Sequence, residues 1–355
     1  MKIGVLTLPF GANYGCLLQS YALYTFLDKS GYDVIMLSRG WNRDKFGLIY
    51  QIKRWIYYNI ICRKLYAFYK KINRSPILRT DNDLLNYVKN NHIDTIIVGS
   101  DQVWRVKNTR GANLNFFLDF LDGDKSIKKI SYAASFGVDI FDGTEDEKNN
   151  VNRLIHQFNS ISVREKSGVE ICKNLFNIDV DITVDPTFLL GKETYMSLFT
   201  NLDKSSRNSI VTYLLDSNER KKTLVNTLAK KRNKSVLNLY SNKIIYSSVE
   251  FWLNSIANAD YVIVDSFHGM VFSLLFEKQF IVINNHKRGS TRFLNLLKQL
   301  DLCDRCIEEN ISESDFELIT SKKINYDIVS PELSKIVIES KEWLSLHIEK
   351  DGSNL

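Results

Sequence analysis

The sequence lacks any run of about 18 consecutive apolar residues, the length that a membrane-spanning helix requires. We therefore expect no transmembrane helix. The apolar stretch at the N-terminus, MKIGVLTLPF, has one lysine, no long apolar region and no small-residue cleavage site, so it is more typical of a first β-strand than of a signal peptide. These absences predict a cytoplasmic protein.

Cysteine is scarce and odd in number, with five residues in a chain of 355. Thiols that are few and scattered are typical of a reducing compartment, not of a disulfide scaffold. Cys303 and Cys306 form one CxxC pair, but a zinc site would need a second pair or nearby histidines, and neither is apparent in the sequence. We therefore expect no metal and no cofactor.

Acidic residues are nearly absent from one segment. Trp41–Thr80 contains ten Lys or Arg and a single acid, Asp44, so it carries +9 while the whole chain carries +6 and the remainder −3. This local basic patch does not indicate nucleic-acid binding across the surface. Apolar side chains recur in it at helical spacing, at Trp55, Tyr58, Cys62, Leu65 and Tyr69. Two interpretations stay open: peripheral contact of 41–80 with an anionic membrane at its inner face, or a helical excursion packed on the N-terminal domain with solvated lysines.

Strand-like and helix-like stretches alternate through both halves of the chain. The strands run from KIGVLTL to SISVR in the first half and from NSIVTYLL to QFIVIN in the second. The alternation predicts an α/β protein of two doubly wound (Rossmann-like) domains. We expect an N-terminal domain over 1–185 that includes the basic excursion at 41–80, a C-terminal domain over 186–330, and a final helix over 331–355 that packs back on the body. Asp185-Pro186 favours a crossing there, because the residue before proline is held extended.

Standard phosphate-binding motifs are also missing, since the chain has neither GxGxxG nor GxxxxGK followed by Ser or Thr. In open parallel sheets, ligands nevertheless bind at the carboxyl ends of the strands. Polar loops fall at five such ends: 11–15, 99–104, 133–137, 164–168 and 265–269. We expect the site among them.

The loop at 265–269 interrupts VIVDSFHGMVFSLLF where a strand gives way to a helix. Ser266 can cap the helix that begins near Gly269, and Gly269 leaves room for a ligand to approach the backbone. His268 then stands beside a helix N-terminus, where it can bind a phosphate or carboxylate or pass a proton. A histidine satisfied by a backbone carbonyl is the alternative.

The other loops supply cations and polar contacts. The cations are Arg164, Arg288 and Arg292, each of which either holds an anionic ligand or is merely paired or solvated. The polar and aromatic candidates for a second ligand are Asn13, Tyr14, Gln19, Gln102 and Trp104. Trp104 is either a platform for a sugar ring or a core residue.

Seven stretches, in this order and spacing, resemble the polysaccharide pyruvyl transferase family: KIGVLTL, NYGCLLQSYAL, IIVGSDQVW, SYAASFG, SVREKSG, VDPTFLL and VDSFHGMVFSLLF. The resemblance covers nearly the whole chain. It implies a GT-B-like fold, phosphoenolpyruvate as donor and a hexose, often galactose, as acceptor. The acceptor would belong to a capsule or exopolysaccharide or to its lipid-linked precursor. The product would be a pyruvate ketal, with release of phosphate.

The resemblance also implies residue roles. A donor-contacting histidine of the family matches His268, flanked here by Ser266 and Gly269, and a donor-contacting arginine matches Arg164. Some members carry a further arginine two residues before the histidine, where this chain has Ser266. The missing cation would then come from the segment Lys287–Arg292, which holds Arg288 and Arg292.

The implied reaction needs an acid, a base and cations for the donor. We expect His268 as proton donor or phosphate ligand and Asp101 or Asp265 as the base for the acceptor hydroxyl. Two rival functions stay open: a GT-B glycosyltransferase that uses a nucleotide sugar, and a non-catalytic glycan-binding relative, suggested by the absent arginine.

Overall fold

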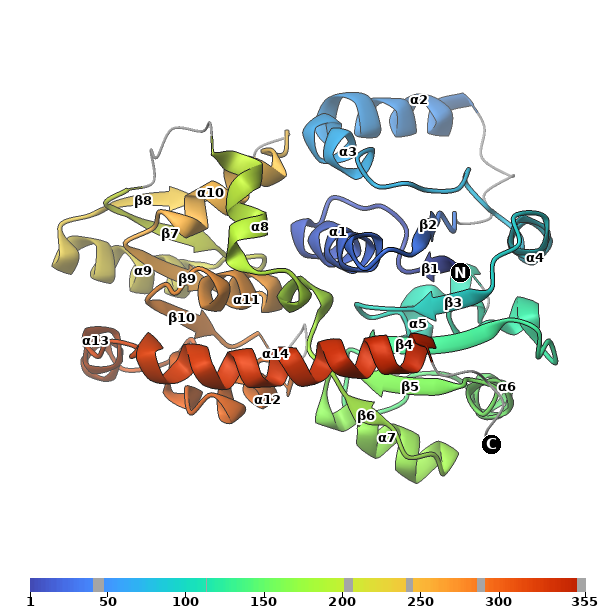
Figure 1. Ribbon diagram of the computed structural model, residues 1–355. Helices are drawn as coiled ribbons and strands as arrows, with labels where there is room; N and C mark the ends of the chain where they lie inside the picture. The colour runs from blue at the N-terminus through green and yellow to red at the C-terminus, as the bar shows by residue number, and fades with distance from the viewer. Residues whose placement is uncertain (41–47, 113, 201–206, 241–244, 286–290, 350–355) are drawn as a thin grey trace. The chain divides into compact units, whose positions relative to one another are not determined.

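The structure is a computed structural model that describes residues 1–40, 48–112, 114–200, 207–240, 245–285 and 291–349 (Figure 1). It divides into two compact units. Unit 1 comprises Met1–Arg54, Tyr69–Leu189 and Ile336–Leu355, and unit 2 comprises Trp55–Phe68 and Leu190–Lys335.

The division differs from the domains expected from the sequence, since the boundary follows Leu189 instead of Asp185 and two further segments group differently. The basic excursion at 41–80 was expected wholly in the N-terminal domain, but its middle part, Trp55–Phe68, groups with unit 2. A backbone hydrogen bond supports this grouping, since the amide of Tyr246 donates to the carbonyl of Ile61 at 3.0 Å. The last helix is not confined to one unit either, because Lys335 closes unit 2 and Ile336 opens the last part of unit 1.

Unit 1 is built on a six-stranded sheet in which all pairings are parallel and the order is β2-β1-β3-β4-β5-β6. The strands are β1 (Lys2–Leu6), β2 (Asp33–Leu37), β3 (Thr95–Val98), β4 (Lys128–Ala134), β5 (Ser160–Val163) and β6 (Asp181–Ile182). The central strands are buried at nearly every position because a parallel sheet is covered on both faces. Alternate residues of β3 show this, since Ile96 and Val98 belong to one core cluster and Ile97 to another.

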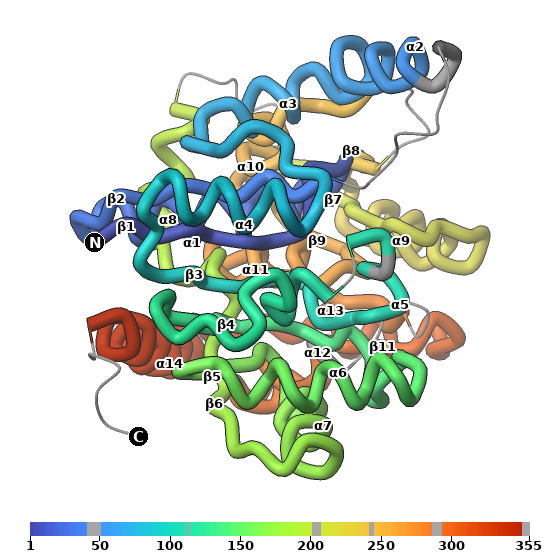
Figure 2. The backbone as a smooth tube through the Cα atoms, turned by 90° about the vertical axis from the view of Figure 1, so that its right-hand side faces the viewer, coloured from blue at the N-terminus to red at the C-terminus, as the bar shows by residue number. Residues whose placement is uncertain are grey.

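Helices cover both faces of this sheet. One cluster combines strand residues with α4 (Asp81–Asn90), α6 (Glu145–Ile155) and α7 (Lys166–Phe176), and the other with α1 (Tyr14–Lys29) and the end of α14 (Tyr326–Glu349). Figures 1 and 2 show α7 beside β5 and β6, and α6 next to α7. Short helical turns complete the unit: α5 (Val106–Thr109), η2 (Arg110–Ala112), η3 (Asn115–Phe117), η4 (Asp119–Leu121) and η5 (Pro186–Leu189). Local sequence explains several helix starts, because Thr80 and Thr144 form capping boxes with Asp83 and Glu147.

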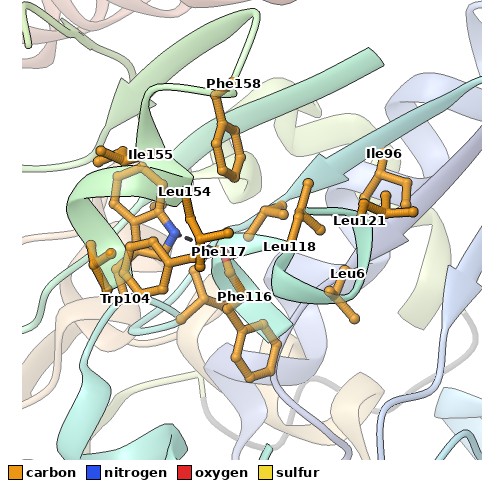
Figure 3. Packing of buried hydrophobic residues seen from close by; sticks show 14 of the residues in the cluster. Leu6, Ile96, Trp104, Phe116, Phe117, Leu118, Leu121, Leu154, Ile155 and Phe158 are labelled. Atoms are coloured by element: carbon orange, nitrogen blue, oxygen red, sulfur yellow. Dashed lines mark hydrogen bonds between the residues drawn. The ribbon is translucent and has the colours of Figure 1, made fainter. Parts of the chain in front are cut away.

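Trp104 belongs to the core cluster that includes α4, α6 and α7 (Figure 3). Its ring stacks on Phe117 with centroids 5.2 Å apart, and its indole N–H donates to the carbonyl of Phe116 at 2.9 Å. The side chain is fully buried and its one polar group is satisfied. Trp104 is therefore a core residue, and the expectation that it forms a platform for a sugar ring is wrong.

Unit 2 contains a five-stranded sheet, again with parallel pairings, in the order β11-β10-β9-β7-β8. The strands are β7 (Ser209–Tyr213), β8 (Ser235–Asn238), β9 (Tyr261–Val264), β10 (Phe280–Ile283) and β11 (Cys306–Ile307). One core cluster joins this sheet to α9 (Glu219–Arg232) and α13 (Glu313–Ser321). Elsewhere in the unit, Trp252 of α10 (Val249–Ala257) packs edge-on against Phe272 of α11 (Phe267–Leu275), with centroids 5.3 Å apart.

The remaining helical elements in the described part of the chain have at most nine residues each. They are α2 (Leu48–Ile56), η1 (Tyr57–Ile61), α3 (Arg63–Tyr69), α8 (Lys192–Met196), η6 (Ser197–Phe199), α12 (Thr291–Gln299) and η8 (Cys303–Arg305). Two parallel sheets flanked by helices confirm the predicted fold class of two doubly wound α/β domains.

Candidate active site

In unit 1, polar side chains gather where the strands end. Arg164 follows β5, Asp101 follows β3 by way of Gly99 and Ser100, and Asp185 follows β6. These ends share one edge of the sheet because the strands are parallel. The sequence prediction of a polar edge is therefore realised within this unit.

Arg164 is the only cation in this group of contacts, and it faces three carboxylates. Its Nη1 lies 2.6 Å from Asp185 Oδ2, and its other nitrogens lie 3.8 Å from Asp101 and 3.7 Å from Glu165. Burial acts to lower the pKa of the guanidinium, but the surrounding carboxylates outweigh it and raise that pKa above its ordinary value. Three carboxylates surround the single positive charge of Arg164, so this group of side chains disfavours an anionic donor. We therefore favour the interpretation that Arg164 is a structural ion-pair residue.

The three carboxylates are not equally engaged. Asp185 Oδ1 accepts from the amide and hydroxyl of Thr187, and Glu165 Oε1 accepts from the Ser135 hydroxyl at 2.8 Å and the Phe136 amide at 3.0 Å. Their side chains are 0% and 2% exposed, against 11% for Asp101. Asp101 is therefore the carboxylate of this cluster that a ligand reaches most easily.

Asp101 is held in place by its backbone and by a thiol. Its φ of 71° is in the left-handed region, and its carbonyl accepts the amide of Ser135 at 3.0 Å. Burial, followed by the charge of Asp101 and its hydrogen bond, raises the pKa of Cys16 well above the ordinary value. Cys16 therefore stays a neutral thiol beside the carboxylate. The sequence did not single out Cys16, because nothing local reveals that α1 brings it to the end of β3.

Most of the residues around α1 that were expected to contact the acceptor have structural roles instead. Gln19 is fully buried, with its amide donating to Thr7 at 3.0 Å and its carbonyl accepting the Ser100 amide at 3.1 Å. It thereby ties the end of β1 to the loop after β3. Tyr14 is 1% exposed, and Asn13 caps α1 by accepting the amides of Gly15 and Cys16. Gln19 and Tyr14 therefore do not present their side chains to a ligand, which corrects that expectation.

Gln102 remains as a half-buried polar residue next to Asp101. Its side chain packs on Gly137, where an added Cβ would lie 2.7 Å from the Gln102 amide carbon. Gly137 has a φ of 73°, so glycine is required there both for backbone conformation and for this close packing. The SYAASFG loop thus orients Gln102 beside the most accessible carboxylate.

In unit 2, the turn after β9 forms as the sequence predicts. Ser266 is the N-cap of α11, and its hydroxyl accepts the Gly269 amide at 3.2 Å. His268 is the second residue of the helix and is 8% exposed, with its ring edge-on to Phe267. It therefore stands in the first turn, where the partial positive charge of the helix N-terminus is felt.

Glycine is needed at position 269 for a different reason from the one expected. A Cβ at this position would lie 2.7 Å from the Ser266 hydroxyl and 2.7 Å from Val264 Cγ1. Glycine is needed so that the first turn of α11 can pack against its own cap and the preceding strand. The prediction that Gly269 leaves room for a ligand is therefore replaced by a packing requirement.

Asp265 is fully occupied by protein partners. Its carboxylate accepts the Leu215 amide at 2.6 Å, the Asp216 amide at 3.1 Å and the Lys221 ammonium at 2.8 Å. The side chains of Asp265 and Lys221 are 0% and 3% exposed. Asn285, after β10, adds a longer contact of 3.4 Å to the same carboxylate. Asp265 therefore anchors the loops after β7 and β10, and the expectation that it serves as a base is wrong.

Lys221 was missed by the sequence reasoning. It lies in the stretch ERKKTL, where its neighbours Arg220 and Lys222 have the same charge and nothing marks one lysine as buried. Its Nζ also donates to the Asp216 carbonyl at 2.9 Å. Within the described residues, no group of three or more His, Cys, Asp or Glu side chains is placed to hold a metal ion.

Comparison with known proteins identifies the family. A model of the polysaccharide pyruvyl transferase family matches residues 13–287, which contain both polar edges described above. The chain belongs to the polysaccharide pyruvyl transferase family. Among curated proteins no match was found.

Solved structures show that this pyruvyl transferase family member has a GT-B-type fold. UDP-N-acetylglucosamine 2-epimerase from Rickettsia bellii aligns with a TM-score of 0.56 and 12% identity, covering 98% of this chain and 96% of that one. The Methanocaldococcus jannaschii UDP-GlcNAc 2-epimerase in complex with UDP-GlcNAc and UDP aligns with a TM-score of 0.54 and 14% identity, covering 96% and 99%. The S. aureus MnaA–UDP co-structure gives 0.55 and 10%, covering 100% and 99%. At these identities the likeness concerns the fold alone.

Two candidate cations of this family member are not placed. Arg288, together with Lys287, lies outside the described residues. Arg292 belongs to α12, and its side chain is not described. The cation that would replace the arginine absent at Ser266 therefore stays a prediction.

Proposed function

We propose that this family member transfers the enolpyruvyl group of phosphoenolpyruvate to a hexose of a surface polysaccharide or of its lipid-linked precursor. The observation that carries the proposal is the histidine in the first turn of α11, within a chain that belongs to this family. The product is a pyruvate ketal on two hydroxyls of the sugar, and inorganic phosphate is released.

The chemistry sets the requirements for the site. A proton adds to the methylene carbon of phosphoenolpyruvate, which becomes a methyl group, and positive charge develops at the neighbouring carbon. One sugar hydroxyl attacks that carbon, the bond to phosphate breaks, and a second hydroxyl closes the ketal. Both sugar hydroxyls lose their protons. One of these protons balances the proton that was added to the methylene carbon, and the other leaves on the phosphate. An acid near the donor and a base near the acceptor are therefore needed.

His268 is our candidate for the donor side. An imidazole in the first turn of α11 can donate a proton or hold the phosphate, and the helix N-terminus attracts an anion at the same place. Asp265 supports this turn by fixing the loops around it through its bonds to Leu215, Asp216 and Lys221. Asp265 is thus a positioning residue in this proposal.

Asp101 is our candidate for the acceptor side. The group around Arg164 contains three carboxylates and one guanidinium, so an anionic donor is disfavoured there and a neutral sugar is not. Asp101 is the most exposed of the three, and Gln102 lies next to it as a hydrogen-bonding partner for sugar hydroxyls. We therefore assign Asp101 as the base, in preference to Asp265.

Calorimetric titration with phosphoenolpyruvate tests the donor assignment without knowledge of the acceptor. We expect binding to the unmodified protein and a loss of at least about tenfold in affinity in His268→Ala, since a hydrogen bond to a charged group contributes about 1.5–3 kcal/mol. His92→Asn is the matched control, because His92 is exposed and its φ of 51° suits asparagine. Its affinity should equal that of the unmodified protein.

The same titration separates the rival functions. Binding of a UDP-sugar, with no binding of phosphoenolpyruvate in the presence or absence of candidate acceptors, would replace the proposal with nucleotide-sugar glycosyl transfer. Binding of glycan alone, with no phosphate released from phosphoenolpyruvate, would indicate a non-catalytic relative. Equal phosphoenolpyruvate affinity in His268→Ala and His92→Asn would remove His268 from the donor site.

A further inference from the structure

The basic segment forms a helical path from α2 through η1 to α3 (Figure 1). Its inner side is anchored, because Cys62, Leu65 and Phe68 are all nearly or completely buried. The π-helical turn η1 lies between the two α-helices, and its Tyr57 carbonyl accepts the Cys62 amide five residues on, at 2.8 Å. Such a turn changes the phase of the residues before it relative to those after it.

Because of this change of phase, large apolar side chains lie on the outer side of the helical path, away from Cys62, Leu65 and Phe68. Ile52, Trp55, Ile56 and Ile60 are 50%, 60%, 37% and 46% exposed. Their spacing of three and four residues puts them on one face of the helix. Trp55 was expected in the same stripe as the buried Cys62 and Leu65, and the structure places it on this outer face instead. A single exposed apolar residue is ordinary, but four on one helical face indicate a contact surface.

Cations accompany these apolar side chains. Lys53, Arg63 and Lys64 are exposed on the same helical path. The sequence from Leu48 to Ile72 contains no aspartate or glutamate. We call the seven residues the outer face: Ile52, Lys53, Trp55, Ile56, Ile60, Arg63 and Lys64. Its combination of a tryptophan, three isoleucines and only positive charge is typical of helices that lie in a membrane interface.

We propose that the outer face docks on the surface of an anionic lipid bilayer. Tryptophan and isoleucine enter the boundary between headgroups and acyl chains, and the cations remain at the level of the lipid phosphates. A nucleic acid would bind the cations but would leave the isoleucines exposed to water. No feature of the outer face requires an acidic protein partner. The contact is peripheral, since none of the helices in the described part of the chain has the length and apolar character needed to cross a membrane. The inference does not depend on the proposed function.

Vesicle sedimentation of the full-length protein tests the proposal. The probes are vesicles of equal parts phosphatidylglycerol and phosphatidylcholine, and vesicles of phosphatidylcholine alone. We expect binding to the first at low salt, at most weak binding to the second, and a marked loss at about 1 M salt, where charges are screened beyond about 3 Å. Removing three cations in Lys53→Gln/Arg63→Gln/Lys64→Gln should weaken binding at low salt by on the order of a hundredfold.

A pair of double variants separates this face from general surface hydrophobicity. Trp55→Ser/Ile60→Ser should weaken binding by at least about tenfold, because two large apolar side chains no longer enter the interface. Leu318→Ser/Ile328→Ser is the matched control, since these side chains are 57% and 66% exposed outside the face. Trp55→Phe should keep most of the binding but lose the blue shift of tryptophan emission that accompanies it. Thermal melting of each variant verifies that it is folded.

Several outcomes would overturn the proposal. One is a lack of sedimentation of the unmodified protein with anionic vesicles at low salt. A second is an equal loss in the control pair. A third is self-association in solution that Trp55→Ser/Ile60→Ser abolishes, because the face would then join two copies of the chain. A fourth is tight binding of a nucleic-acid oligomer that depends on the three cations and competes with vesicles.

Discussion

Replacing Lys221 with methionine should destabilise unit 2 strongly. Methionine keeps most of the apolar stem but removes the ammonium that lies 2.8 Å from Asp265 Oδ2, at side-chain exposures of 3% and 0%. Breaking a buried ion pair by removing one partner costs about 3–5 kcal/mol, because the other charge stays buried without compensation. Asp265 keeps the amides of Leu215 and Asp216 as donors, so we expect the lower end of that range, about 3 kcal/mol.

The assay is urea-induced unfolding of the full chain at neutral pH. Lys222→Met is the control, because Lys222 is 58% exposed and pairs only at the surface with Glu219, so its removal should change the free energy of unfolding by less than about 0.5 kcal/mol. The double variant Lys221→Met/Asp265→Asn should recover at least about 1 kcal/mol relative to Lys221→Met, because the uncompensated charge is gone. If Lys221→Met and Lys222→Met unfold at the same urea concentration, the reasoning about the buried pair is refuted.

Three further predictions concern packing and pH. Gly269→Ala should cost about 1–3 kcal/mol in unfolding free energy, because its Cβ would lie 2.7 Å from the Ser266 hydroxyl and from Val264; an unchanged melting temperature would contradict this. Trp104→Ala should cost about 3–5 kcal/mol through the cavity it leaves, without weakening glycan binding while the protein is folded; selective loss of glycan binding at full stability would restore the platform interpretation. Burial raises the pKa of the Cys172 thiol to about 12. In the unfolded chain the thiol keeps its ordinary pKa, so above about pH 9 it ionises there while it stays neutral in the folded protein, and the folded state loses stability as the pH rises. The free energy of unfolding of the unmodified protein should therefore fall by up to about 1.4 kcal/mol per pH unit more than that of Cys172→Ala. Parallel stability curves for the two proteins between pH 8 and about 10.5 would rule that out.

The fold was predictable because its signals are local. Apolar strands such as those at Thr95–Val98 and Tyr261–Val264 are followed by polar loops and amphipathic helices, and this alternation leaves little choice other than a doubly wound sheet. The cap at Ser266 was predictable for the same reason, since a serine three residues before Gly269 at a strand-to-helix junction needs no distant partner.

The site was less predictable because its roles depend on distant contacts. Asp265 follows a strand, as a base would, and only Lys221, 44 positions earlier, reveals its structural role. Arg164 has the local pattern of an anion ligand, but Asp185 lies 21 positions away and neutralises it. Trp104 shares its loop with polar residues, yet Phe117 and Phe158 from other segments enclose it. In each case charge or burial is decided by a partner that the local sequence does not contain.

The outer face of α2 and α3 illustrates a third kind of limit. Helical spacing placed Trp55 with Cys62 and Leu65, which assumes uniform α-helical geometry. The π-helical turn at Tyr57–Ile61 breaks that assumption and turns Trp55 outward. A change of helical period cannot be read from spacing alone when the residues are apolar on both sides of it.

Isotope incorporation into the product tests the central claim most directly. The protein would be incubated in deuterium oxide with phosphoenolpyruvate and a panel of galactose-bearing oligosaccharides, with phosphate measured and products examined by mass spectrometry. We predict one deuterium in the new methyl group of a pyruvate ketal and one phosphate released per ketal, with both lost in His268→Ala and retained in His92→Asn. Transfer of a sugar from a UDP-sugar, with phosphoenolpyruvate left intact across the panel, would contradict the claim.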